Sequence, residues 1–157
     1  MSFVALPEAK LHLRVDGTDE DALIGVYIAA AEQSAVSLLD RGVYADGTAL
    51  GAARAAAPAE LTAATVTYTE AIAAAQALAD TTEQAAATQA AEYAYLRAQV
   101  AYRQAMDGMV VNDTIKSAVL LIVGHLYAHR EDVVAGVSVA KLPNGAEWLL
   151  APYQVYA

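Results

Sequence analysis

Two alanine-rich segments, residues 59–79 and 83–106, restrict the fold of this chain more than any other feature. Alanine loses no side-chain entropy in a helix and buries little area, so such segments favour helices over strands or a bulky core. Between them, the sequence DTTE offers Asp80 as a helix N-cap with Glu83 as its partner. The segments therefore predict an antiparallel helical hairpin. A low-complexity arm that is ordered only by a partner is the alternative.

Two helices are predicted before the hairpin. Residues 6–14 predict a short helix, because Pro7 suits a first helical turn. Residues 18–41 predict a longer helix, with Thr18 as N-cap and three acids in its first turn, where the helix dipole favours them. Its expected apolar stripe follows helical spacing and comprises Leu23, Tyr27, Ala30 or Ala31, Ser34 and Leu38.

A third helix is predicted after the hairpin, and it is apolar on most sides at its start. It runs over about 114–131, is capped by one of the residues 112–114, and is expected to be the buried central helix. Glycines and an Asp-Gly pair predict a loop over 43–58. The fold class is therefore all-α. A small helical bundle spans 1–157 as one domain, with 43–112 as an inserted loop and hairpin.

The C-terminal part, residues 133–157, is predicted to be a loop followed by an extended arm. Ala146–Leu150 can form one helical turn, which Pro152 stops. Trp148, Tyr153 and Tyr156 are candidate interface residues, because tryptophan and tyrosine are favoured anchors in protein interfaces.

Charge and composition exclude several functional classes. The chain carries 9 Lys+Arg against 18 Asp+Glu, and its net charge of −9 repels DNA phosphates. It has no cysteine, which excludes disulfides and thiolate metal sites. The N-terminus does not resemble a signal peptide, and the longest strongly apolar run, 118–124, is far shorter than the roughly 20 residues that span a bilayer. We expect a soluble protein without a cofactor.

The end of the central helix carries the most chemically suggestive residues. His125 and His129 share one helix face, a spacing that can ligate zinc, but Leu126 stands where the zincin pattern requires glutamate. A hydrogen-bonded pair in the core or at its boundary is the favoured interpretation. A small helical metal-binding protein or enzyme that uses both histidines is the alternative. A helical adaptor from a cellular pathway is a third hypothesis.

Arg130, Glu131 and the acids near residue 16 are interpreted as structural. Glu131 and Asp132, which follow Arg130, suit a salt-bridged helix end better than a pair of carboxylates for acid–base catalysis. The planar guanidinium of Arg130 can hold a carboxylate with two hydrogen bonds, so a bridge to Asp16 or Asp21 is a hypothesis. His125, Tyr127 and Arg130 are expected to fix the central helix against residues 16–21.

Three sequence motifs in this order resemble the small head-tail connector proteins of long-tailed phages, also called head-completion or adaptor proteins and often described as DNA-packaging proteins. The motifs are LHLRVDGTDEDALIGVYIAAAEQ, which contains Arg14, Asp16 and Asp21, then IKSAVLLIVGHLYAHRED, and finally LPNGAEWLLAPYQVY. The matching residues are 11–41, 114–132 and 142–153. The chain departs from the family in the alanine-rich segment 43–112, and in Gln154, where family members have arginine.

The resemblance implies a structural, non-catalytic subunit of the virion neck that is made in the host cytoplasm. It implies a homo-oligomeric ring, twelve-fold to match the portal, which lies below the portal and extends the DNA channel. Double-stranded DNA passes through without specific binding, and a neck or tail-completion protein docks underneath. No membrane is involved. The resemblance also leaves open that the isolated subunit is monomeric until it meets the portal.

Overall fold

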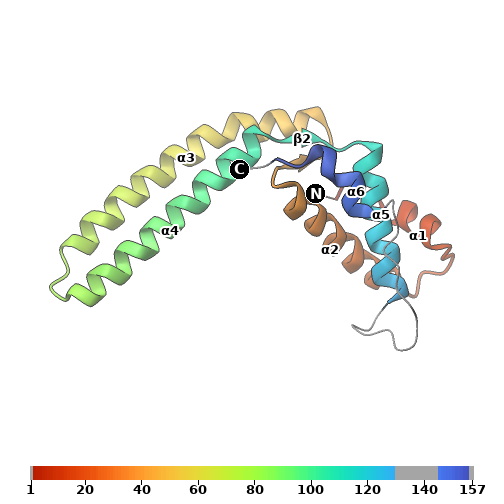
Figure 1. The fold of residues 1–157 in the computed structure, drawn as a ribbon, viewed down its shortest axis with the longest axis horizontal. Coiled ribbons are helices and arrows are strands. Elements are labelled where there is room, and N and C mark those ends of the chain that lie inside the picture. Colours follow the sequence, from red (N-terminus) through yellow and green to blue (C-terminus); the bar gives the residue numbers. More distant parts are fainter. Residues whose placement is uncertain (1, 130–144, 156–157) are drawn as a thin grey trace. The chain divides into compact units, whose positions relative to one another are not determined.

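The computed structural model describes residues 2–129 and 145–155, which are shown as the coloured ribbon in Figure 1. The chain divides into two compact units. Met1–Gly47 and Met109–Ala157 form the first unit, and Thr48–Gly108 form the second. The predicted all-α class is confirmed, because the described residues are mainly helical and their only sheet has two strands of two residues each.

The first unit is a small bundle around helix α5. Its helical elements are α1 (Leu6–Leu13), α2 (Asp21–Leu39), α5 (Asp113–Ala128), α6 (Ala146–Leu150) and the 3-10 turn η1 (Ala151–Tyr153). Helix α5 contacts α1, α2 and α6, which confirms it as the central helix. The side chain of Asn112 caps it by accepting a hydrogen bond from the Ile115 amide at 2.9 Å. It ends at Ala128, earlier than predicted, because His129 leaves the helical conformation.

The buried stripe of α2 lies one residue beyond the predicted one. Its buried residues are Ile24, Ile28, Ala31, Ala35 and Leu39. Of the positions in the expected apolar stripe, only Ala31 belongs to the buried one, and Leu38 is exposed. The prediction failed because α2 is apolar on most of its surface, so two neighbouring faces fit helical spacing equally well. Burial of each larger side chain stabilises the fold by about 1.5–3 kcal/mol.

The predicted Thr18 cap is also wrong. Helix α2 begins at Asp21, and its N-cap position is Glu20, which makes no side-chain cap bond. The carbonyl of Thr18 instead accepts a hydrogen bond from the Asp21 amide at 3.1 Å, which forms a turn before the helix. The side chains of Glu20 and Asp21 contact other helices. Cross-helix partners have therefore replaced local capping.

By length and composition alone, α2 resembles a membrane span, since it is 19 residues long and strongly apolar. Core helices of soluble proteins meet the same criterion. The buried stripe of α2 forms the core together with residues of α5 such as Ile115 and Val119. Its apolar character is therefore accounted for, at least on one side, by packing within the unit.

A short parallel strand pair closes the first unit where the chain leaves it and returns. Strand β1 (Val43–Tyr44) pairs with β2 (Met109–Val110). The Met109 amide donates to the Gly42 carbonyl at 2.9 Å, and the Val111 amide donates to the Tyr44 carbonyl at 2.8 Å. The two ends of the alanine-rich excursion are thus joined by backbone hydrogen bonds, which sequence reasoning did not predict.

The second unit consists of two long helices, α3 (Gly47–Gln76) and α4 (Thr81–Met106), which run antiparallel in Figure 1. Asp80 caps α4 as predicted, because its carboxylate accepts the amides of Thr82 and Glu83 at 2.7 and 3.1 Å. The predicted loop over 43–58 is wrong, since α3 already begins at Gly47 and continues through Pro58. The alanines of this stretch favour a helix strongly enough to override the glycine and proline signals.

Candidate functional site

The end of α5 is joined to the segment before α2 by side-chain contacts. The Tyr127 hydroxyl donates a hydrogen bond to a carboxylate oxygen of Glu20. Lys10 of α1 forms an ion pair with Asp21 at 2.6 Å, and both side chains are partly buried. These two contacts connect α1, the turn before α2, and α5. Each of the two acids at this corner therefore faces a hydrogen-bond donor from another helix, and these contacts stabilise the fold.

The other residues that were predicted to lie at this corner make no such contact within the described part of the chain or lie outside it. Arg14 is exposed and ends α1 in the left-handed conformation, with φ of 58°. Asp16 is exposed in the following turn. Arg130 and Glu131 lie outside the described residues, so the bridge from Arg130 to Asp16 or Asp21 stays a prediction. Lys10, which pairs with Asp21, was not among the residues predicted for this corner. It lies in the last turn of α1, four residues before the predicted Arg14.

His125 of α5 and His129, which directly follows the helix, are exposed rather than buried in the core. The rings of His125 and His129 meet edge to face, with centroids 4.8 Å apart. Within residues 2–129 and 145–155, no group of three or more His, Cys, Asp or Glu side chains is arranged to hold a metal ion. His12 of α1 packs over Gly124, and its Nε2 atom lies 3.3 Å from the position of a Cβ added at that glycine.

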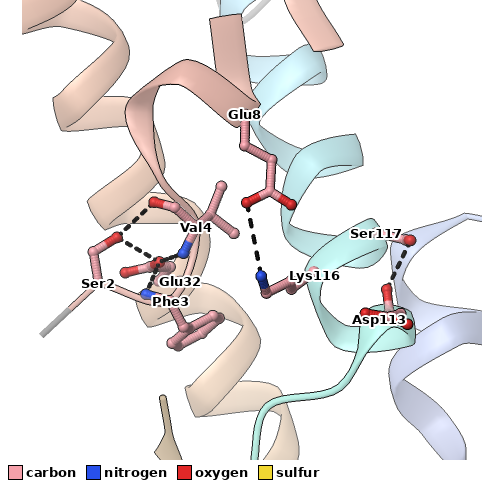
Figure 2. Close-up of polar contacts among 8 residues, drawn as sticks. All are labelled: Ser2, Phe3, Val4, Glu8, Glu32, Asp113, Lys116 and Ser117. Carbon is pink, nitrogen blue, oxygen red and sulfur yellow. Dashed lines mark hydrogen bonds and ion pairs between the residues drawn. The ribbon is translucent and has the colours of Figure 1, made fainter. Parts of the chain in front are cut away.

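The residues around the start of the chain form a second structured site, shown in Figure 2. One carboxylate oxygen of Glu32 accepts three hydrogen bonds of 2.8 Å, from the Ser2 hydroxyl and from the amides of Phe3 and Val4. Phe3 and Val4 are buried in the core. Sequence reasoning missed Glu32, although it is the one charged residue of α2 beyond Asp21 at the start of the helix.

An open depression of about 550 Å³ lies beside this N-terminal segment. Apolar residues such as Ile28 and Val111 line it together with Glu32. At its edge the Lys116 ammonium lies 3.8 Å from a carboxylate oxygen of Glu8, as Figure 2 shows. The depression is open and mostly apolar, which suits a protein segment better than a tightly enclosed small molecule.

The C-terminal segment is packed on the core of its own unit. Leu150 is fully buried, and the Val155 amide donates to the Leu39 carbonyl at 3.0 Å. Tyr153 is partly buried against the same core, and Arg41 donates to its carbonyl oxygen at 3.4 Å. Trp148, by contrast, is 61% exposed. Of the three aromatic interface candidates, the described structure thus leaves Trp148 open to solvent, while Tyr156 lies outside the described residues.

The second unit has its own polar and aromatic contacts between α3 and α4. The rings of Tyr68 and Tyr95 stack with centroids 4.9 Å apart. Hydrogen bonds from the side chains of Thr65 and Gln99 lower the pKa of Tyr95, because they stabilise the phenolate. Such contacts order the helix pair. They do not bring a nucleophile and a base together.

A comparison with protein families identifies the chain. The model of the phage gp6-like head-tail connector protein family matches residues 3–88, which is more than half of the sequence. The chain belongs to this family. No curated protein and no solved structure matches it. The connector is therefore a structural component of a phage virion that assembles with other proteins at the head-tail interface.

The range matched by the family model covers the N-terminal part of the connector. It covers α1, α2, β1, α3 and the start of α4, and so it includes the first of the three motifs quoted above. The motifs in 114–132 and 142–153 follow the matched range. The matched range also extends through α3, which belongs to the segment where the sequence departs from the family pattern. The assignment thus rests mainly on the N-terminal half.

Proposed function

We propose that this connector forms a ring beneath the portal, extends the DNA channel and provides the docking surface for the next neck or tail protein. Membership of the head-tail connector family carries the proposal. In this function the chain performs no catalysis and needs no cofactor. It is made in the host cytoplasm and acts in the virion neck, as a ring of twelve copies that matches the symmetry of the portal.

Exposed apolar side chains support a function in assembly. In the first unit, Leu11 of α1 is 82% exposed, Val26 of α2 is 63% exposed and Trp148 of α6 is 61% exposed. Single exposed apolar residues are common on soluble proteins. Tryptophan, however, is enriched in the energetically dominant centres of interfaces, so Trp148 is the residue we assign to contact with a neighbouring protein.

The charge of the connector supports a passage for DNA rather than a binding site for it. A net charge of −9 makes the average surface potential repulsive to phosphate. A protein that binds duplex DNA gains affinity by releasing counterions through lysine and arginine contacts. This chain has 9 such residues against 18 acids. Some of them already serve the fold, as Lys10 does with Asp21.

Electron microscopy of the purified connector mixed with the portal of its virion tests the proposal. The expected result is a ring of twelve connectors coaxial with the portal, with a continuous central channel. A gel-shift assay with duplex DNA at physiological salt is expected to detect no binding. A connector that never joins the portal, and that antibodies fail to detect in the necks of virions, overturns the proposal.

Trp148 gives a second test, because it is the only tryptophan in the sequence. Its emission is expected to shift to shorter wavelength when the portal or the next neck protein is added, since burial in an interface removes water from the indole. Trp148→Ala is expected to weaken binding to one of these partners by about tenfold or more, the effect of an interface hot spot. Unchanged emission with both partners contradicts the role of Trp148.

A further inference from the structure

The second unit exposes bulky apolar residues that its own folding does not use. On α4, Tyr93, Leu96 and Val100 are 66%, 57% and 42% exposed. They follow each other at intervals of three and four residues, so they share one face of the helix. We call them the α4 outer face. Val100 lies nine residues, or about two and a half turns, after the buried Ala91, so this face points away from α3.

Helix α3 has a corresponding outer face with smaller side chains. Val66 is 51% exposed and lies nine residues from both Ala57 and Ala75, the two buried residues of α3. By the same helical geometry it points away from α4. Its neighbours on this face, Thr62 and Thr69, are exposed and small. We call Thr62, Val66 and Thr69 the α3 outer face. One side of the hairpin is thus bulky, and the opposite side is shallow.

The stacked tyrosines place these two faces at the same height along the hairpin. Tyr68 and Tyr95 are level with each other, and the helices are antiparallel. Val66 lies two residues before Tyr68 on α3, and Arg97 lies two residues after Tyr95 on α4. Because the helices run in opposite directions, these two steps lead toward the same end of the hairpin. Val66 is therefore level with the middle of the α4 outer face. A second hairpin, moved sideways without sliding, can bring its α3 outer face against the α4 outer face of the first.

Opposite charges flank the two faces in a matching way. Glu70 follows Val66 by one turn on α3, and Arg97 follows Leu96 on α4. Viewed along each helix, Glu70 and Arg97 lie beside their outer faces, and both are rotated from them in the same sense. The axes of the antiparallel helices α3 and α4 define a plane, and an approximate two-fold axis perpendicular to that plane relates the two helices. Because Glu70 and Arg97 are rotated in the same sense from their outer faces, both side chains lie on the same side of the plane. In two adjacent hairpins, Arg97 of one copy and Glu70 of the next therefore lie along the same edge of the contact.

We propose that the α4 outer face of one subunit packs against the α3 outer face of the next, so that the hairpins stand side by side around the ring. This inference rests on the proposed ring. The contact joins two different patches, which is what an interface that closes a ring requires. It also gives the alanine-rich excursion a purpose in assembly, namely to bind a second copy of this chain.

Engineered cysteines test the contact directly, because the natural chain has no cysteine. The variant Val66→Cys/Leu96→Cys carries both thiols on opposite sides of one hairpin, too far apart for a disulfide within a chain. On the assembled connector–portal complex, mild oxidation is expected to produce a ladder of covalent oligomers. Each single-cysteine variant is expected to produce none. Dimers from Leu96→Cys alone indicate a symmetric α4–α4 contact and overturn the proposal, as does the absence of a ladder.

A charge exchange supplies a second test with an internal rescue. Arg97→Glu and Glu70→Arg are each expected to weaken ring formation, seen as at least a severalfold lower yield of complete rings in electron micrographs. The double variant is expected to restore the yield. Glu92→Arg, a charge change on the opposite edge of α4, is the control and is expected to leave it unchanged.

The outcomes separate this inference from the proposed function. Wild-type protein that forms no ring with the portal overturns the ring itself. Wild-type rings that form equally well with Arg97→Glu overturn only the contact between hairpins. Cross-linking of Leu96→Cys to a different virion protein also overturns it, because the α4 outer face then has another occupant. Circular dichroism of each variant verifies that the helices are intact.

Discussion

The hydroxyl of Tyr127, near the end of α5, donates its hydrogen bond to the carboxylate of Glu20, in the turn before α2. The contact joins residues that are far apart in the sequence, and it is partly buried. A hydrogen bond to a charged group stabilises a fold more than a neutral one does. Together with the Lys10–Asp21 ion pair, it holds the corner where three segments of the first unit meet.

Tyr127→Phe is expected to lower the free energy of unfolding of the first unit by about 1–2 kcal/mol, because it removes the donor and leaves the Glu20 carboxylate without it. Urea unfolding followed by the emission of Trp148 measures the change. Tyr27→Phe is the matched control, since the Tyr27 hydroxyl has no hydrogen bond to the described part of the chain. Equal losses in the two variants contradict the assigned role of the Tyr127–Glu20 bond.

Glu32→Ala is expected to release residues 2–4 from α2. The substitution removes the acceptor of two backbone amides and one hydroxyl, so the expected loss of stability is about 2–3 kcal/mol. Hydrogen exchange measures it locally, through faster exchange of the Phe3 and Val4 amides. Gln33→Ala, at the exposed neighbouring position, is the control and is expected to leave both amides protected. Continued protection in Glu32→Ala shows that burial alone holds the segment.

The N-cap of α4 is expected to weaken in acid. Hydrogen bonds from the amides of Glu83 and Thr82 hold the pKa of Asp80 below its usual value of 3.8. A lowered pKa in the folded state means that the cap is fully effective above the usual pKa and is lost as the pH falls through the lowered one. Exchange of these two amides is therefore expected to increase, relative to unstructured peptides, only below about pH 4.

Asp80→Asn separates this titration from other effects of acid. Asparagine is a comparably good N-cap but does not titrate, so the Thr82 and Glu83 amides of the variant are expected to stay protected at low pH. If both proteins lose protection together, the protonation of another group opens the start of α4.

Gly124→Ala is expected to stabilise the first unit by about 0.5–1 kcal/mol, because glycine in a helix interior costs conformational entropy. The new methyl group approaches His12, whose exposed side chain can move away. Gly25→Ala in α2 is the comparison, since nothing lies within 4 Å of a Cβ added there. Thermal unfolding of both variants measures the effect. A fall in stability for Gly124→Ala alone means that the packing of His12 on α5 is rigid.

Local signals of the sequence predicted the helix starts that depend on one side chain. The side chains of Asp80 and Asn112 each accept hydrogen bonds from backbone amides two or three residues further along the chain, so a few neighbouring residues contain all the information needed. The Thr18 cap failed because Glu20 and Asp21 have partners on other helices. Such partners are distant in the sequence, and no local pattern reveals them.

The buried face of α2 and the start of α3 show two other limits. In α2 the choice between Ile24 and Leu23 as core residue depends on which helix packs against it, because both faces are apolar. In α3 the glycines and Pro58 indicated a loop, whereas the alanines extended the helix back to Gly47. The role of Glu32 at the candidate site depends on residues 2–4 folding back along α2, which becomes visible only in three dimensions.

The parallel pairing of β1 with β2 limits how short the excursion between them can become. Antiparallel strands can be joined by a two-residue turn, but parallel strands need a crossover of roughly a dozen residues or more. The connection from Tyr44 to Met109 therefore has a minimum length that α3 and α4 far exceed. An engineer who replaces this excursion can choose freely among longer grafts, but a tight loop cannot bridge the pair without breaking its ladder.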